Sequence, residues 1–296
     1  DLRFRGTEGL IASYLLPTPD GWAVVETGPT SCRAELLRGL AEAGIAPEEV
    51  RQIFVTHIHL DHAGGLGALA GEFPRARLYS HRAGVPHLID PTRLIASARR
   101  AWGAAADPLW GAIHPVPADR LEALDGGERF PLRHGALEAI ATPGHARHHL
   151  AFFDTGRAAL MTGDAAGVRI GAAAVARPAV PPPDTDIEQL FESLDRMRAL
   201  RPKELLYTHF GPSAASAEVF GQYRGEVEAW RDVVRRAALE RPDVEFITEQ
   251  LRAFAEERRP REPTEGSTEL ISGYGLAAQG LLRYLRERGE IPIAPG

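Results

Sequence analysis

Short apolar runs, bounded by proline, glycine or aspartate, recur through the first two thirds of the chain and predict β-strands. Residues 10–16 (LIASYLL) and 22–27 (WAVVET) are two such runs, and the prolines between them favour a turn. In residues 51–56, Ile53 and Val55 recur at a period of two, which indicates a buried strand. Further strands are predicted at residues 136–142, 149–153, 158–162 and 204–208.

A second periodicity, close to that of an α-helix, appears between and after these runs. Residues 31–43 carry leucines at helical spacing and precede Gly44, which favours a helix end. Residues 82–115 interrupt the strand pattern with a helical stretch that contains Trp102 and Trp110, and this indicates an insertion. Helices are also predicted at residues 187–200, 213–240, 245–258 and 268–288.

The order of these elements predicts an α/β fold in two parts. Residues 1–212 form the predicted catalytic core, with a helical insertion at about 82–125. Residues 213–296 contain no strand of useful length and form a predicted helical C-terminal extension. In its last helix, leucines recur near helical spacing, so we expect this helix to pack on the core. These leucines are Leu276, Leu281, Leu282 and Leu285.

Composition narrows the possible classes of protein. The chain has 296 residues, of which 44% are hydrophobic, so it can build a sizeable core. Cys32 is its single cysteine, which excludes a scaffold held by intrachain disulfides. No run approaches the roughly 18 apolar residues of a spanning helix, and the first ten residues lack the apolar core of a signal peptide. We therefore expect a cytoplasmic protein without membrane contact.

The charge of the chain bears on its partners. The formal net charge is −6, from 40 acidic and 34 basic side chains. Such a balance offers no broad basic surface for phosphate backbones, which disfavours nucleic acid. The expected partner is a small-molecule substrate, and a homodimer remains open.

Residues 56–65 (THIHLDHAGG) hold an unusual density of metal-binding side chains. His57, His59, Asp61 and His62 place four strong transition-metal ligands within six positions, directly after a predicted strand. Ligands this close cannot all reach one small cation without crowding, so the spacing suggests two neighbouring ions. The first hypothesis is a hydrolytic metal centre.

Three further candidate ligands also follow predicted strands. His145 comes after a Pro-Gly turn in PGHARHH, Asp164 ends TGD, and His209 lies in THFGP. Side chains just past strand ends can converge along one edge of a sheet assembly. The sequence therefore predicts that all seven candidates meet at one site.

The chain carries four motifs in order: HxHxDH, a distant PGH, GD, and a histidine after a strand. Over roughly residues 10–212, this order resembles the metallo-β-lactamase superfamily. The intervals are 83 residues from His62 to His145, 19 to Asp164 and 45 to His209. The last two resemble the glyoxalase II and lactonase branches, and the insertion lengthens the first. The resemblance implies a four-layer αββα sandwich with a helical insertion and a helical C-terminal extension.

The resemblance also implies roles for the seven candidates. His57, His59 and His145 would hold one Zn²⁺, with Fe or Mn as alternatives, and a second ion would have its own three ligands. Asp164 would bridge the two ions. The second set consists of Asp61, His62 and His209.

A water between the two ions would be acidified to a pKa near 7 and would exist as hydroxide at neutral pH. The predicted activity is a dinuclear zinc hydrolase in which this bridging hydroxide attacks a small ester, thioester, lactone or lactam. Asp61 would orient the hydroxide and pass a proton to the leaving group.

Other functions remain open at this point. One is a mononuclear iron enzyme resembling persulfide dioxygenases, which fill only the first metal site. His209 favours the dinuclear hydrolase, because it supplies a second-site ligand. A phosphodiesterase is chemically possible, although the acidic balance disfavours polyanions. A scaffold without catalysis is disfavoured, because all seven candidates are present.

Several other residues were considered for function. We expect His148 and His149 to support the site rather than to bind metal. We expect Cys32 to be a small buried side chain rather than a nucleophile. Trp102, Trp110 and Tyr274 fit core packing better than a substrate pocket, and both readings stay open. The chain carries Glu26-Thr27-Gly28 where many relatives carry Asp-Thr-Gly.

Overall fold

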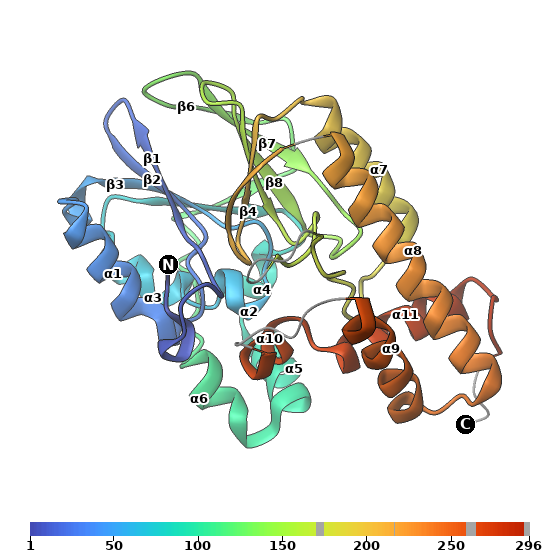
Figure 1. Ribbon diagram of the computed structural model, residues 1–296. Helices are drawn as coiled ribbons and strands as arrows, with labels where there is room; N and C mark the ends of the chain where they lie inside the picture. Colours follow the sequence, from blue (N-terminus) through green and yellow to red (C-terminus); the bar gives the residue numbers. More distant parts are fainter. Residues whose placement is uncertain (170–174, 216, 259–264, 293–296) are drawn as a thin grey trace.

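Two β-sheets form the centre of the computed structural model, which describes residues 1–169, 175–215, 217–258 and 265–292 (Figure 1). The first sheet has five strands in the order β1-β2-β3-β4-β5, and the second has six in the order β11-β10-β9-β8-β7-β6. The first consists of β1 (Tyr14–Thr18), β2 (Gly21–Val25), β3 (Val50–Phe54), β4 (Arg77–His81) and β5 (Leu121–Leu124). The second consists of β6 (Arg129–Pro131), β7 (Ala136–Ala141), β8 (Leu150–Asp154), β9 (Ala159–Gly163), β10 (Glu204–Tyr207) and β11 (Gly211–Ala214).

The central strands are buried on both faces. In β2, Val25 packs between the two sheets, whereas Val24 faces the outer side of the first sheet. In β3, Phe54 likewise packs between the two sheets, and Ile53 faces the outer side of the first sheet. Successive side chains of a strand point to opposite faces, so each strand contributes to two apolar layers.

Helices cover the outer face of each sheet (Figure 1). Leu36 of α1 and Leu66 of α3 pack on the first sheet, and Leu190 of α7 and Trp230 of α8 pack in one cluster with Leu160 of β9. The result is a four-layer αββα sandwich, which confirms the expected fold class. The helices are α1 (Arg33–Glu42), α2 (Leu60–Ala63), α3 (Leu66–Glu72), α4 (Val85–Ile89), α5 (Thr92–Trp102), α6 (Ala106–Trp110), α7 (Ile187–Ala199), α8 (Ala217–Glu240), α9 (Val244–Arg258), α10 (Glu265–Ser272) and α11 (Tyr274–Glu287).

The structure differs from the sequence prediction at several boundaries. The first strand begins at Tyr14 rather than at residue 10. The predicted insertion reaches to about residue 125, but its helices end at Trp110. Residues 121–124 form β5 and belong to the first sheet. Likewise, β11 extends past the predicted boundary at residue 212. The division into a core and an extension stays a prediction.

The terminal helix α11 packs against α8 and α9, which belong to the helical side of the second sheet. Leu281, Leu282 and Leu285 of α11 are buried in the same apolar cluster as Leu160 of β9. Leu276, the fourth leucine of this segment, is partly buried. No helix in the described part of the chain combines the length and the apolarity needed to cross a membrane.

Arg177 links the α10–α11 junction to the sandwich. Its guanidinium is buried, donates to the Ser272 carbonyl oxygen and to the Tyr274 hydroxyl at 2.9 Å each, and lies 4.3 Å from the centre of the Tyr274 ring. We expect Arg177→Met to lower the free energy of unfolding by about 2–3 kcal/mol, because it leaves polar groups of the junction without their donor. Urea denaturation measures this loss. Arg283→Met removes an exposed ion pair with Glu287 from the same helix and should cost under about 0.5 kcal/mol; equal losses in the two variants would contradict this role.

Candidate metal centre

The carboxyl ends of four strands converge at one end of the two sheets. The strands β2, β3 and β4 run parallel, as do β9 and β10. Since β8 is antiparallel to both β7 and β9, those two strands share one direction. In the segment after β3, the loop carries His57 and His59 and the short helix α2 carries Asp61 and His62. The segments after β7, β9 and β10 carry the other three candidates. All seven predicted side chains therefore lie together, as expected.

Three ring nitrogens form the first group. His57 Nε2 lies 2.9 Å from His59 Nδ1, and His145 Nε2 lies 3.1 and 3.0 Å from these two atoms. Three mutually close nitrogens cannot all be satisfied by hydrogen bonds to one another. Their arrangement fits three lone pairs directed at a common cation.

A second group lies beside it. His62 Nε2 and His209 Nε2 are 3.1 Å apart, and Asp61 Oδ2 lies 3.8 and 3.4 Å from them. Two imidazoles and one carboxylate are a ligand set that zinc accepts. This is the composition that the sequence predicted for the second ion.

Asp164 lies between the two groups. Its Oδ2 is 3.5 Å from His145 Nε2, whereas its Oδ1 is 3.3 Å from His62 Nε2 and 3.7 Å from His209 Nε2. The Oδ1 atom is buried and accepts no hydrogen bond from the described residues. A buried carboxylate oxygen without a donor is costly unless a cation compensates for it. Each oxygen thus faces one group, and the donor set fits two metal ions.

Hydrogen bonds to the opposite ring nitrogens fix the tautomers. The Nδ1–H of His145 donates to the Ala179 carbonyl at 2.9 Å, and that of His209 donates to the Leu10 carbonyl at 2.7 Å. The Nε2 lone pair of each ring is therefore free to point into the site.

Glu26 performs the same task for two more histidines. Its buried Oε1 accepts from His62 Nδ1 at 3.2 Å and from the Thr56 hydroxyl, and the Thr56 Oγ1 lies 3.0 Å from His57 Nδ1. Thr208 donates to the same oxygen at 3.3 Å. The substitution of Glu26 for the aspartate of many relatives therefore leaves the site supported. The departure from Asp-Thr-Gly singles out this position in the sequence, but the partners of the Glu26 carboxylate lie at least 30 positions away and could not be predicted.

We expect Glu26→Gln to weaken metal binding by roughly 10- to 100-fold, because the neutral amide holds the His57 and His62 tautomers less firmly. Competition with a chromogenic chelator measures the affinity. Glu122→Gln, at an exposed position of β5, is the matched control and should bind metal as the unaltered chain does. Equal affinity in the two variants would rule out this role for Glu26.

Burial and charge set the protonation of the cluster. Burial lowers the pKa of His59 to about 3 and that of His57 well below its usual value, so both imidazoles are neutral at pH 7. Burial would lower the pKa of His62 too, yet the carboxylates of Asp164, Glu26 and Asp61 hold it well above its usual range. The raised pKa of His62 reflects the negative charge of the three carboxylates around it. A bound cation would neutralise this charge.

The two histidines after His145 act differently from the ligand candidates. His149 Nδ1 lies 2.8 Å from the Thr142 hydroxyl, and its Nε2 accepts from the Asp164 backbone N–H at 3.1 Å. Both ring nitrogens are thus engaged, and His149 positions Asp164. Gly163 makes this contact possible, because a Cβ there would lie 2.5 Å from His149 Nε2. His148 is buried beside the site, with Nε2 3.9 Å from Asp184 Oδ2.

The structure also places the cysteine and the aromatic residues that the sequence singled out. Cys32 is buried, as expected for a small core side chain, and burial raises the pKa of its thiol to about 12. Trp110 is buried, stacks on Phe4 at 5.5 Å and lies 5.1 Å from Trp102. Both tryptophans also line a cavity above the cluster, whereas Tyr274 packs under Arg177. Both readings therefore hold for the tryptophans.

Two curated proteins, both hydrolases by name, are similar to this chain over about half of its length. The chain is 30% identical over 156 residues to a hydroxyacylglutathione hydrolase from Aeromonas hydrophila subsp. hydrophila, covering 52% of this chain and 45% of that protein. It is 27% identical over 166 residues to an atrochrysone carboxyl ACP thioesterase from Aspergillus fumigatus, covering 55% and 41%. The chain spans less than two thirds of the length of the curated relatives it matches first.

The fold has a counterpart among solved structures. A metallo-beta-lactamase family protein from Thermus thermophilus superposes with a TM-score of 0.72 at 25% identity, covering 94% of this chain and 89% of that one. The family model described as the metallo-beta-lactamase superfamily matches residues 6–209. Because this match covers most of the chain and includes every strand that carries a candidate ligand, the chain belongs to the metallo-β-lactamase superfamily.

Proposed function

We propose that this protein is a metal-dependent hydrolase with a dinuclear zinc centre, acting on a small ester or thioester. The observation that carries the proposal is the placement of Asp164, whose two carboxylate oxygens each face a separate group of ring nitrogens. His57, His59 and His145 would hold one ion and Asp61, His62 and His209 the other. Ions held there would supply an acidified water and polarise the substrate carbonyl.

The residues around the centre would prepare it for that chemistry. The Ala179 and Leu10 carbonyls hold His145 and His209 in the metal-binding tautomer, so these imidazoles need no rearrangement. Asp61 lines the cavity above the cluster, with Oδ2 3.4 Å from His209 Nε2. Its carboxylate can accept a proton from water and return it to the leaving group.

Thioesters are the favoured substrates within this class. The relatives named above are a hydroxyacylglutathione hydrolase and an ACP thioesterase, and both names refer to acyl groups on sulfur. Lactones and lactams share the electrophilic carbonyl and remain alternatives. Thiolate leaves more readily than alkoxide, so thioesters need less help from a proton donor.

Removal and return of metal test this function. We expect dialysis against a strong chelator to lower thioester hydrolysis by at least about 100-fold and Zn²⁺ to restore it, because water is then no longer activated. A panel of thioesters, aryl esters, acyl-homoserine lactones and β-lactams, assayed by product release, identifies the class. The proposal would be contradicted if the metal-free protein kept its full activity. It would also be contradicted if the reconstituted protein hydrolysed no compound of the panel.

A further inference from the structure

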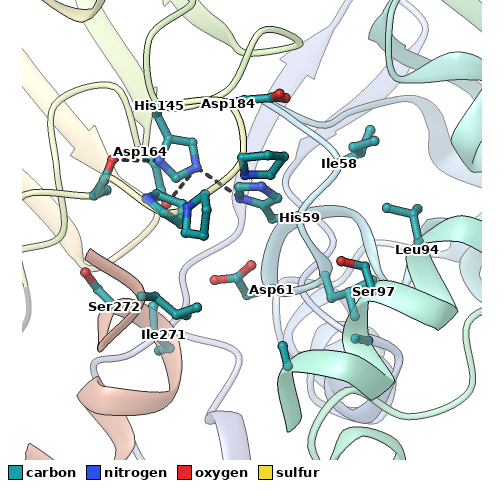
Figure 2. Close-up of a pocket in the computed structure, with 18 of the residues that line it drawn as sticks. Ile58, His59, Asp61, Leu94, Ser97, His145, Asp164, Asp184, Ile271 and Ser272 are labelled. Carbon is teal, nitrogen blue, oxygen red and sulfur yellow. Dashed lines mark hydrogen bonds and ion pairs between the residues drawn. The ribbon is translucent and has the colours of Figure 1, made fainter. Parts of the chain in front are cut away.

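A cavity of about 780 Å³ opens above the candidate metal centre. His59, Asp61, His145 and Asp164 lie at its base, and its walls come from elements outside the two sheets. Figure 2 shows Leu94 and Ser97 of α5 on one side of Asp61, and Ile271 and Ser272 of α10 on the other. A cavity of this size accommodates a substrate larger than an acetyl or lactoyl group.

The wall near the centre is mainly apolar. Ile58, Leu94 and Trp102 line it from one side, and Ile271 and Leu276 line it from the C-terminal helices. Apolar surface of this kind favours an apolar acyl group, since its burial contributes about 25 cal/mol per Å² removed from water.

One edge of the wall is basic. Arg93, Ser97 and Arg100 recur at i, i+4 and i+7 of α5 and therefore share one side of the helix. Leu94 and Ala98 lie on the adjacent side, so this wall changes from basic to apolar around the helix.

These two arginines are available to a ligand. Arg93 and Arg100 are exposed, and neither donates a hydrogen bond or forms an ion pair to any residue within the described ranges. In contrast, Arg99 lies 3.9 Å from Asp107 and does not line the cavity, and Arg147 lies 3.7 Å from Asp184. Hydrogen bonds from Thr92 and, to a smaller extent, the charge of Arg93 lower the pKa of Asp90, so Arg93 has one acidic neighbour. At the edge of the cavity, the two guanidinium groups form a local cationic surface in a chain of net charge −6.

We propose that the substrate is a thioester with a bulky apolar acyl group and an anionic thiol, whose anionic part is bound by Arg93 and Arg100. This inference rests on the proposed hydrolase function. Water adds to the acyl carbon, the acyl–sulfur bond breaks, and the products are a carboxylate and a thiol with release of one proton. The shared chemistry of the thiol is a phosphate or carboxylate group, since guanidinium binds both in a bidentate manner.

Thioesters with matched acyl groups test the anionic part. Octanoyl thioesters of coenzyme A, of glutathione and of neutral N-acetylcysteamine are assayed with the reconstituted protein. We expect kcat/KM for at least one anionic thioester to exceed that for the neutral one by roughly tenfold, and coenzyme A and glutathione distinguish phosphate from carboxylate. The double substitution Arg93→Gln and Arg100→Gln should reduce this ratio roughly tenfold, chiefly through KM.

Two controls separate binding from general damage. Arg99→Gln removes a charge from the same helix away from the cavity and should keep the ratio. Calorimetric titration with the free thiol, coenzyme A or glutathione, supplies a measurement independent of turnover, and the double variant should bind it more weakly. A ratio near one, or a ratio that the double variant leaves unchanged, would overturn the inference.

The acyl part is tested separately. Wild-type protein should prefer octanoyl over acetyl thioesters by roughly tenfold or more, as expected for burial of several methylene groups. Ala101 of α5 lines the cavity, so Ala101→Trp should narrow the cavity and reduce this preference. Ala104 does not line the cavity, so Ala104→Trp should leave the preference unchanged. Hydrolysis of the neutral thioester without either preference would refute this inference and support the proposed function; hydrolysis of no ester or thioester would refute both.

Discussion

Replacing Asp164 with alanine is expected to lower kcat/KM by at least about 10³-fold, because several kcal/mol of transition-state stabilisation depend on correctly placed ions. Its two oxygens face His145 on one side and His62 and His209 on the other, and no other described carboxylate approaches both groups this way. Steady-state kinetics with the best thioester of the panel measures the effect.

Asp164→Asn separates charge from shape in the same position. It keeps one oxygen and the side-chain volume, so we expect folding close to that of the unaltered chain and still a large loss of activity. Asp119→Asn, at an exposed turn, is the control and should retain full activity. Near-normal turnover by either Asp164 variant would show that the carboxylate does not hold the ions.

The second large effect is expected from His209→Ala. His209 Nε2 lies 3.1 Å from His62 Nε2 and 3.4 Å from Asp61 Oδ2, so its loss removes one of three ligands from the second group. We expect the metal content to fall from about two ions to about one and kcat/KM to fall by roughly 10³-fold. Elemental analysis of protein purified without chelator measures the first change, and steady-state kinetics the second.

The same variant distinguishes the dinuclear hydrolase from a mononuclear iron dioxygenase. A mononuclear enzyme would use the group formed by His57, His59 and His145, so loss of His209 would leave both its metal content and its oxygen consumption unchanged. His114→Ala, an exposed histidine substitution, controls for the change of residue type. One ion per chain before and after the His209 substitution would contradict the dinuclear account.

The ligand positions could be predicted because they depend on local rules. Each group of candidates lies in the segment after a strand with an apolar run, and the carboxyl ends of strands in one direction meet at the same edge. The alternation of Ile53 and Val55 placed His57 at such an end, and β9 and β10 did the same for Asp164 and His209. The convergence of the seven side chains therefore followed from order and spacing.

Other features depended on contacts between distant segments and could not be predicted. The β4 segment (Arg77–His81) has a short apolar run flanked by charge, and its pairing with β3 and β5 determines its conformation. Glu26 supports the site from a left-handed backbone conformation at φ 72°, which no periodicity signals. Gly64 and Gly65 form the turn between α2 and α3 with negative φ. A Cβ at Gly64 would lie 2.4 Å from the Leu60 carbonyl oxygen, so close packing requires this glycine.

The cavity above the candidate metal centre could not be predicted from the sequence either. The predicted insertion and the C-terminal helices gave no motif for binding, since neither segment encloses a space by itself. In the structure, Leu94 of α5 and Ile271 of α10 line one cavity although 177 positions separate them in the chain. The shape of this cavity thus arises from packing between segments, which local patterns do not specify.

We propose that the two groups of side chains hold two metal ions with Asp164 between them. Anomalous diffraction from crystals of zinc-loaded protein, collected on both sides of the zinc absorption edge, would locate these ions. We predict two anomalous peaks roughly 3.5 to 4 Å apart, one beside His57, His59 and His145 and the other beside Asp61, His62 and His209, with Asp164 between them. A single peak, or no peak among these residues, would contradict the account.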